Sequence, residues 1–312
     1  VRNRIDVPES LKHPRLSIGL PVYNGEACLQ EALDSILGQS FEDFELLLSD
    51  NASTDRTREI CEACVASDPR VRYVRHEQNL GAAGNFNFVV HEAKGEYFKW
   101  ASHDDRMHPT LLERSIAVLD ADPEVVLCHP RTAMIDGAGR HTRDFVDDLN
   151  LMHDRPHQRM GHLVTHMRLC NAVMGVMRLE VLRRTRLIDS FRTADFITLI
   201  ELSILGKFHE IEEHLYERRD HDDRILRKTK DKSAVQAWFN PSVKTVARFP
   251  GLKLFREQFR SISRLDLPAG TAWKCRLTVG RWVLKRGRVR LGRWRRRVFG
   301  PSARGPESVR AT

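Results

Sequence analysis

Apolar and polar positions alternate regularly over the first hundred residues of the chain. Four short runs are rich in apolar and β-branched residues, as buried strands are: 15–23, 44–49, 71–75 and 97–101. Between them lie three stretches of helical character: 26–37, 54–66 and 86–93. This β-α-β-α-β-α-β order predicts a parallel, doubly wound sheet.

The pattern continues to about residue 224. Further strands are predicted at 125–129, 133–139, 171–177 and 207–211, and further helices at 110–119, 179–184 and 196–205. Residues 145–161 are polar and contain His153 and His157, so we expect a long loop over the sheet there. Loops of that length are often lids or acceptor sites.

Polar side chains follow three of the predicted strands where the strands end. They are Tyr23 and Asn24, Asp50 and Asn51, and Asp104 and Asp105. In an open α/β sheet, ligands bind at the carboxyl ends of strands. The adjacent carboxylates Asp104 and Asp105 repel each other unless a cation or hydrogen-bond donors separate them. A hard divalent metal carrying a diphosphate would satisfy them. The alternative is a solvated loop with two capping aspartates, but three converging polar loops favour a ligand site.

Two common nucleotide-binding motifs are missing from the sequence. No G-x-G-x-x-G follows the first strand, and the spacing of Gly81 and Gly84 differs from that fingerprint, which disfavours a dinucleotide dehydrogenase. No G-x-x-x-x-G-K-[ST] loop is present, which excludes the P-loop NTPases.

Composition narrows the class of protein. The chain has 312 residues, of which 41% are hydrophobic and 30% charged, as in soluble globular proteins. It has no apolar run long enough for a transmembrane helix, and its first residues lack an apolar signal core, so we expect it in the cytoplasm. The 6 cysteines are scattered, which suits free thiols; Cys61 and Cys64 are interpreted as structural, with a redox or metal role as the alternative.

The positive charge is concentrated near the carboxyl end. Residues 267–306 contain twelve Lys or Arg and no acid, and without those twelve the formal net charge of +9 would be −3. Apolar residues recur there every three or four positions, from Trp273 and Leu277 through Leu284 to Trp294. The pattern describes a basic amphipathic helix. It could lie on an anionic membrane, pack on its own domain or bind nucleic acid, and we consider nucleic acid the weakest of the three.

The strand-end motifs, taken together, resemble the inverting family-2 glycosyltransferases of the A-type fold, over about residues 16–221. The four matching segments are Pro-Val-Tyr-Asn-Gly-Glu at 21–26, Ser-Asp-Asn-Ala-Ser-Thr-Asp at 49–55, Asn-Leu-Gly at 79–81 followed by Asn85, and 95–105, which ends in the acidic pair. The resemblance implies a GT-A-type nucleotide-diphospho-sugar transferase fold, a Rossmann-like, mainly parallel sheet.

The resemblance also implies roles for single residues on the donor side. Asp50 would recognise the base of a nucleotide-diphosphate sugar, with Pro21, Tyr23, Glu26 and Asn79 around it. Asp104 would face the ribose or the metal, and Asp105 would bind a divalent ion, Mg²⁺ or Mn²⁺. Where many relatives have a third acid, this chain has His103, which leaves the number of protein metal ligands open.

On the acceptor side, Asp195 matches the position of the catalytic base, which deprotonates the acceptor hydroxyl so that the anomeric carbon inverts. Its alternative role is a helix N-cap, and Glu201 is a weaker second candidate for the base. His221 matches a histidine that in relatives closes on the metal or the diphosphate; the alternative is a surface histidine.

These inferences lead to one expected organisation and one expected function. We expect an amino-terminal arm at 1–14, a GT-A domain at 15–224 and a helical, basic extension at 225–312. The expected activity is transfer of a sugar from a nucleotide-diphosphate sugar to a saccharide or lipid-linked acceptor, in cell-surface polysaccharide or glycolipid biosynthesis. The alternative is a non-catalytic protein that binds nucleotides or nucleic acid.

Overall fold

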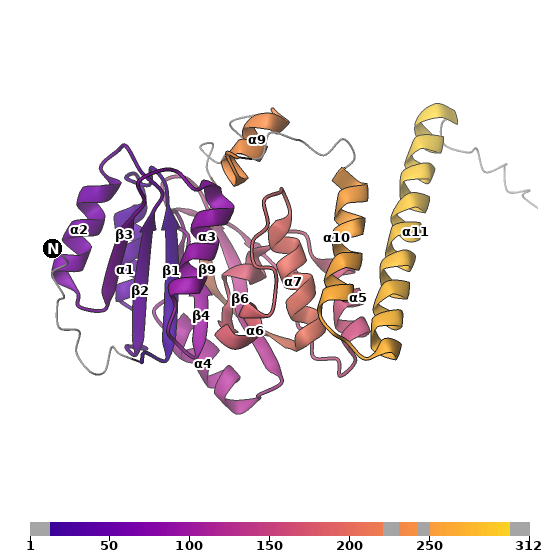
Figure 1. The fold of residues 1–312 in the computed structure, drawn as a ribbon, viewed down its shortest axis with the longest axis horizontal. Coiled ribbons are helices and arrows are strands. Elements are labelled where there is room, and N and C mark those ends of the chain that lie inside the picture. Colours follow the sequence, from indigo (N-terminus) through magenta and orange to yellow (C-terminus); the bar gives the residue numbers. More distant parts are fainter. Residues whose placement is uncertain (1–12, 221–230, 243–249, 300–312) are drawn as a thin grey trace, which may run out of the picture.

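A computed structural model describes residues 13–220, 231–242 and 250–299 (Figure 1). Its strands are β1 (Leu16–Val22), β2 (Phe44–Asp50), β3 (Val71–Arg75), β4 (Tyr97–Trp100), β5 (Arg106–Met107), β6 (Val125–Ile135), β7 (His141–Phe145), β8 (Val176–Arg178) and β9 (Lys207–Arg219). Its helices are α1 (Leu29–Leu37), α2 (Thr57–Ser67), α3 (Gly81–Glu92), α4 (Leu111–Ala121), α5 (Pro156–His166), the 3₁₀ turn η2 (Asn171–Met174), α6 (Leu179–Arg183), α7 (Ala194–Leu205), α9 (Lys232–Phe239), α10 (Pro250–Arg264) and α11 (Ala269–Phe299).

The strands form one mixed sheet in the order β3-β2-β1-β4-β8-β6-β9-β5, with β7 paired to β6. The predicted parallel arrangement holds for β3, β2, β1 and β4, and β6 also runs parallel to β9. β8 lies between β4 and β6 and is antiparallel to both. The carboxyl ends of β1, β2 and β4 therefore meet at one edge, as the sequence predicts.

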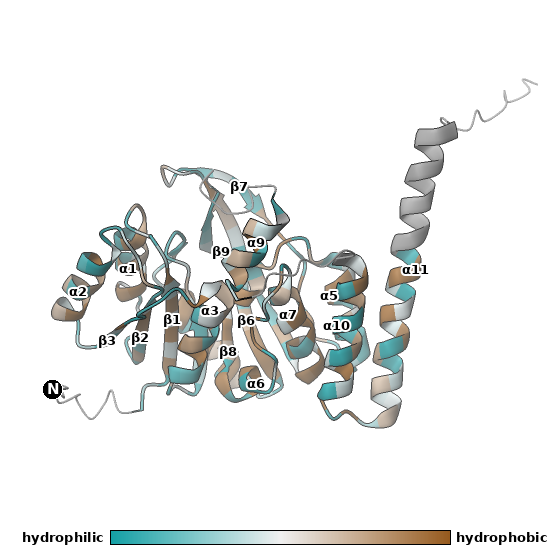
Figure 2. Cartoon of the chain, turned by 45° about the horizontal axis from the view of Figure 1, so that its top comes forward, coloured by the Kyte–Doolittle hydropathy of each residue, from teal (hydrophilic) through white to brown (hydrophobic). Residues whose placement is uncertain are grey.

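Each face of the sheet buries its own hydrophobic core. Alternate residues of β1 and β2 pack against α1, α2 and α4 on one face. The opposite face packs against α3, α5, α6, α7, α10 and α11. Figure 1 shows α3 on the other side of the sheet from α1, and α5, α10 and α11 at the end of the molecule away from β3. Both faces of the central strands are covered, which explains why most of their residues are apolar (Figure 2).

The segment at 125–139 was predicted as two strands and is one, because β6 runs unbroken from Val125 to Ile135. Pro130 interrupts the apolar run in the sequence, and the register of β6 against β9 shifts between Pro130 and Thr132. A bulge is a position where a strand tolerates proline, so the strand continues through it.

The prediction of a long loop at 145–161 is partly wrong, because helix α5 begins at Pro156. Pro156 occupies the first turn, and only Met160, Leu163 and Val164 supply a buried apolar stripe. Arg159 is buried as well, and its guanidinium donates to the carbonyl oxygens of Ser203 and Ile204 at the end of α7 (2.8 and 3.0 Å). A polar residue thus does the packing that the sequence pattern assigns to apolar ones.

The strand predicted at 171–177 is also only partly correct. Residues Asn171–Met174 form the 3₁₀ turn η2, and the strand β8 begins at Val176. Gly175 lies between them, and a Cβ there would come within 2.5 Å of the Cys128 carbonyl oxygen. The missing side chain of Gly175 therefore allows η2 and β6 to approach each other closely.

Helices α10 and α11 share the core of the main domain. Ile262 and Leu265 from α10, and Cys275 and Val279 from α11, belong to the same buried cluster as β4 and α7. The predicted domain boundary at 224 falls within 221–230, outside the described residues, as does most of the predicted arm at 1–14. The division into three segments therefore stays a prediction.

The pair Cys61 and Cys64 lies on the buried side of α2. Burial raises the pKa of the Cys61 thiol to about 12 and that of Cys64 to about 11. Neutral buried thiols are poor nucleophiles and poor metal ligands, which supports the structural interpretation.

Candidate active site

The first two strand-end loops are tied together by hydrogen bonds. Asn24, which has a φ of 50°, accepts a bond from the Thr54 amide through its side-chain oxygen (2.9 Å) and donates its own amide to Ser53 Oγ (2.9 Å). The Gly25 amide donates to Thr57 Oγ1 (2.8 Å). A Cβ on Gly25 would lie 2.9 Å from the His103 ring, so glycine allows the loop after β4 to approach. Three loops converge here, as predicted.

The residues expected around the nucleotide differ in exposure. Pro21 is buried within β1, whereas Tyr23 is 42% exposed at the strand end. The Glu26 carboxylate accepts a bond from the Arg56 amide at the start of α2 (3.0 Å), and the Glu26 amide donates to Asp55 (3.0 Å). Glu26 thus joins α2 to the first loop, while Tyr23 remains available to a ligand.

Asp50 ends β2 with its side chain completely buried. Its carboxylate accepts bonds from the Ser53 amide (2.8 Å) and the Tyr73 hydroxyl (2.8 Å), and Arg75 Nε lies 3.5 Å away. Burial and this carboxylate raise the pKa of the Tyr73 hydroxyl. Asp50 therefore organises the loop around the expected base pocket, and direct contact with the base stays a prediction.

The third motif connects to the second through amide side chains. Asn51 donates to Asn79 Oδ1 (2.9 Å), and the same oxygen accepts a bond from the Gly81 amide at the start of α3 (2.7 Å). Asn85 is buried and binds both Ser49 Oγ (2.5 Å) and the Ser49 carbonyl (2.9 Å). Asn79 and Asn85 thus hold α3 against the end of β2.

The acidic pair lies just after β4 and is almost buried, with Asp104 and Asp105 8% and 6% exposed. Asp104 accepts a hydrogen bond from the Ser102 hydroxyl. Asp105 accepts one from the Tyr216 hydroxyl and one from the Arg219 amide (2.8 Å). Burial and the Asp105 charge raise the pKa of Tyr216 well above its usual range, so Tyr216 acts as a hydrogen-bond donor to Asp105.

Arg219, at the end of β9, contacts both residues of the acidic pair. The sequence analysis missed this residue. Its side chain is buried; Nε donates to the Asp104 carbonyl oxygen (2.8 Å), Nη1 to the Gly137 carbonyl oxygen (3.0 Å), and Nη2 pairs with Glu31. The loops after β4 and β6 are thereby fixed together. The sequence analysis placed Arg219 only near the end of the predicted domain at about residue 224.

Lys99 is a second missed residue, and it lies beneath the acidic pair in the middle of β4. Its ammonium group is fully buried, donates to the Met174 carbonyl and lies 5.4 Å from the centre of the Tyr216 ring. Burial lowers the pKa of Lys99 to about 7, while the Asp105 charge opposes that shift. The Asp105 carboxylate is therefore close enough to offset part of the cost of burying the Lys99 charge.

Asp195 belongs to the first turn of α7 and is not the N-cap, which corrects one alternative from the sequence. The N-cap is Thr193, with a φ of 77°, and Asp195 accepts a bond from the adjacent Phe196 amide (2.9 Å). Burial, together with the neighbouring Asp195, raises the pKa of the Cys170 thiol. Asn171, the neighbour of Cys170, accepts a hydrogen bond from Arg218 near the end of β9, and Tyr216 and Arg219 of the same strand contact Asp105. Asp195 and the acidic pair therefore lie near the same end of β9.

Glu201 is not placed to act as the base. Its side chain is fully buried and accepts bonds from the Arg186 amide (2.7 Å), Arg186 Nε (3.1 Å) and Arg264 Nη2 (2.8 Å). These partners join α7 to α10. His221 lies outside the described residues, so its role at the metal or diphosphate stays a prediction.

The comparison with protein families agrees with this geometry. The model of glycosyl transferase family 2 matches residues 17–184, more than half of the chain. The chain belongs to glycosyl transferase family 2. The matched residues contain the three polar loops and the acidic pair, whereas Asp195 and Arg219 follow the matched segment.

Curated relatives of this family-2 chain resemble it over part of its length. An uncharacterized glycosyltransferase of Rickettsia felis is 32% identical over 139 residues, which are 44% of this chain and 23% of that relative. The matched segment thus spans less than a quarter of that relative's length.

Solved structures show the same fold at low sequence identity. TarS 1-349 of S. aureus, in complex with UDP-GlcNAc, superposes with a TM-score of 0.60 at 16% identity, covering 83% of this chain and 69% of TarS. The mannosyltransferase PcManGT of Pyrobaculum calidifontis, in complex with GDP-Man and Mn²⁺, has a TM-score of 0.50 at 17% identity, covering 91% and 78%. The fold of the family-2 chain is the GT-A fold.

Proposed function

We propose that the chain transfers a sugar from a nucleotide-diphosphate sugar to an acceptor hydroxyl, with inversion at the anomeric carbon. The observation that carries the proposal is the buried pair Asp104 and Asp105. It follows His103, whose ring lies against Gly25 where the loops after β1 and β2 meet. TarS and PcManGT bind nucleotide sugars on the same fold. A ligand with a base, a ribose and a diphosphate is long enough to contact all three loops.

A divalent metal fits the chemistry of the acidic pair. Asp104 and Asp105 offer hard oxygen ligands, which Mg²⁺ and Mn²⁺ prefer. Arg219 and Tyr216 hold Asp105 from behind, so its orientation is set before any ligand arrives. When bound, the metal would stabilise the negative charge that develops on the leaving diphosphate.

Asp105→Asn tests the donor site. The amide keeps the size of the side chain and removes the charge, so we expect loss of metal-dependent nucleotide-sugar binding with the fold retained. Asp144→Asn, at an exposed carboxylate on β7, is the matched control and should bind as the parent chain does. A thermal-shift screen of UDP-, GDP- and dTDP-sugars with Mn²⁺ or excess EDTA measures both. Full-strength donor binding and turnover in EDTA would exclude the metal role.

Asp195 is the residue we propose as the base. It lies at the start of α7, near the end of β9 that also holds the acidic pair, and it is only partly buried. A carboxylate there can accept the proton of an acceptor hydroxyl that approaches opposite the leaving diphosphate. The proton leaves the attacking oxygen as the new glycosidic bond forms and the bond to the diphosphate breaks.

The carboxyl-terminal helix supports a further part of the proposal, that the enzyme works at an anionic membrane surface. On α11 the packing face consists of Ala272, Cys275, Val279 and Trp282, and Trp282 Nε1 donates to the Val164 carbonyl oxygen on α5 (2.7 Å). A second apolar stripe, Trp273, Leu277 and Leu284, lies on the opposite side of the helix and is 61%, 42% and 66% exposed. This stripe is therefore not used for packing on the domain.

Basic residues flank the exposed stripe. Lys274, Arg276, Arg281 and Lys285 follow or precede its members along the helix. Each basic side chain near an anionic surface contributes on the order of 1 kcal/mol. Among the described residues, no helix is both long enough and apolar enough to span a bilayer. Attachment by one amphipathic face would bring the chain to a lipid-linked or glycolipid acceptor.

Vesicle co-sedimentation tests this attachment. Truncation near residue 267 would remove Cys275 and Val279 and expose the core that they pack against. A surface substitution is therefore the better perturbation. We expect Trp273→Ser with Leu284→Ser to reduce pelleting with anionic vesicles and to leave the melting temperature unchanged. Binding should also weaken as salt rises, because the Debye length is about 10 Å at 0.1 M. Equal pelleting of parent and variant, or pelleting indifferent to anionic lipid, would refute the proposal.

A further inference from the structure

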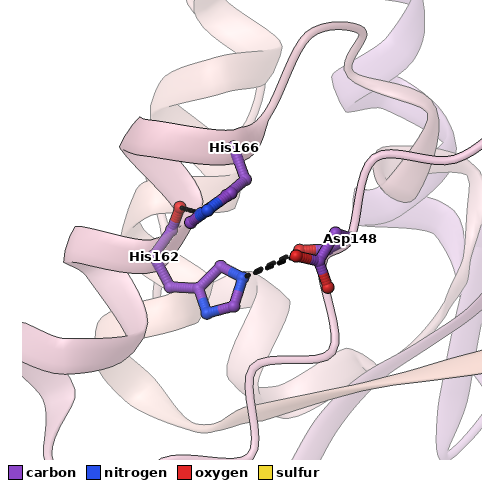
Figure 3. Close-up of side chains that lie close together, drawn as sticks. All are labelled: Asp148, His162 and His166. Carbon is purple, nitrogen blue, oxygen red and sulfur yellow. Dashed lines mark hydrogen bonds and ion pairs between the residues drawn. The ribbon is translucent and has the colours of Figure 1, made fainter. Parts of the chain in front are cut away.

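The segment around α5 gathers polar side chains that the proposed transfer reaction does not use. His162 and His166 are one turn apart on α5, and Asp148 reaches them from the loop after β7 (Figure 3). One ligand atom from each of the three residues lies within 4.8 Å of the other two. His153 extends the group, with its ring centre 5.7 Å from that of His162.

We propose that Asp148, His162 and His166 form a binding site for a zinc-class divalent ion, separate from the acidic pair after β4. Two imidazole nitrogens and one carboxylate oxygen make a donor set that Zn²⁺ accepts, with a fourth position left for water. The acidic pair offers oxygen atoms alone, which suits Mg²⁺ or Mn²⁺. The two sites therefore differ in the ion that they select.

The distances are compatible with zinc after small side-chain rotations. Zinc ligands lie about 2.0–2.2 Å from the ion, so the ligand atoms of a tetrahedral site are about 3.4 Å apart. His162 Nε2 lies 3.8 Å from Asp148 Oδ2. Asp148 and His166 are exposed, so small side-chain rotations can bring the ligand atoms together; from separations of up to 4.8 Å they have to close by at most about 1.4 Å.

Backbone contacts orient the ligands. His166 Nδ1 lies 3.0 Å from the His162 carbonyl oxygen, so Nδ1 carries the proton and Nε2 presents its lone pair. Asp148 has a φ of 53°, a left-handed conformation that aspartate tolerates, and its carbonyl oxygen lies 2.9 Å from His162 Nε2. When His162 Nε2 binds an ion, the imidazole proton of His162 has to reside on Nδ1. His153 Nε2 lies 3.5 Å from His162 Nδ1 and is able to accept a hydrogen bond from it.

The spacing of the two rings suits a shared ion. The ring centres of His162 and His166 are 4.3 Å apart, so one nitrogen of each can reach the same ion. A bound ion would fasten the loop after β7 to α5, and the Val164 carbonyl oxygen of α5 accepts a hydrogen bond from Trp282 of α11.

Zinc titration of the chelator-treated full chain, by isothermal calorimetry, tests the site. We expect one zinc ion bound, and His162→Ala and His166→Gln to weaken the affinity at least about 10-fold, because even second-shell changes cost about 10–100-fold. His166 is exposed, so His166→Gln keeps the fold if His162→Ala does not. His157→Ala is the matched control, since His157 lies on the same helix but near Lys274 of α11.

Asp105→Asn separates this site from the acidic pair and should leave zinc binding unchanged. The proposal is overturned if the parent chain binds no zinc, if His166→Gln binds it within twofold of the parent, or if Asp105→Asn abolishes binding. The zinc site does not rest on the transferase proposal, so either can fail without the other.

Discussion

Glu201→Gln removes one charge from the interior of the molecule and tests whether Glu201 is structural. The carboxylate is fully buried between α7 and α10 and accepts three hydrogen bonds, two from Arg186 and one from Arg264. Arg186 also pairs with Glu257 (2.7 Å). The substitution leaves both guanidinium groups facing a neutral amide.

The expected cost follows from the burial of the partners. Breaking a buried ion pair by removing one charge costs about 3–5 kcal/mol. The lower end, about 3 kcal/mol, applies here because the amide retains an acceptor and Arg264 is 39% exposed, so water screens it in part. With an unfolding entropy of about 2.1 cal/mol/K per residue, that corresponds to a melting temperature about 5 °C lower.

Thermal unfolding monitored by circular dichroism, at one pH and salt concentration, measures this shift. Glu180→Gln, at an exposed position on α6, is the control and should melt within about 1 °C of the parent. Nucleotide-sugar binding should be unchanged in both variants below their melting temperatures. A Glu201→Gln chain that melts like the parent but transfers no sugar would refute the structural assignment and restore Glu201 as a catalytic candidate.

Three further predictions concern the site and the extension. Asp195→Asn should abolish sugar transfer while donor affinity and melting temperature stay unchanged; activity near the parent's would remove Asp195 as the base. Lys99→Met should stabilise the chain more at pH 6 than at pH 9. The pKa of Lys99 is about 7 in the folded chain and 10.5 when the side chain is exposed. The free-energy cost of burying Lys99 is therefore largest below pH 7 and falls as the pH rises toward 10.5. Over two pH units above 7 the difference between variant and parent should shrink by about 2.7 kcal/mol, measured by melts at both pH values, and a pH-independent difference would contradict the burial argument. On α11, Val279→Ala should cost about 2 kcal/mol and Leu284→Ala less than about 0.5 kcal/mol in chemical denaturation, and equal costs would show that the exposed stripe also packs.

The amino-terminal half of the fold was predictable because local pattern and tertiary environment agree there. Strands β1, β2 and β4 are buried on both faces, so most of their residues are apolar and each strand stands out from its neighbours. Parallel strands place their carboxyl ends at one edge, so the polar residues that follow them had to converge. The three polar loops could therefore be located from the sequence.

The carboxyl-terminal half was harder because its packing uses polar groups. Helix α5 buries Arg159 against the carbonyl oxygens that end α7, and no apolar periodicity announces such a contact. β6 passes through Pro130 because a bulge absorbs it. Segments of this kind owe their structure to partners distant in sequence, which a local pattern does not contain.

Apart from the two-residue strand β5, the order of strands and helices before residue 124 was contained in the sequence by itself, and so were the three polar loops and the basic amphipathic helix at the carboxyl end. Each of these depends on spacing along the chain. Only the tertiary structure placed Tyr216 and Arg219 behind Asp105, paired Glu201 with Arg264, and separated the packing face of α11 from its exposed stripe. Those outcomes depend on which surfaces meet. Contacts between residues a hundred positions apart form only when the whole sheet and its helices are assembled, and the free energy that selects them is that of the complete core.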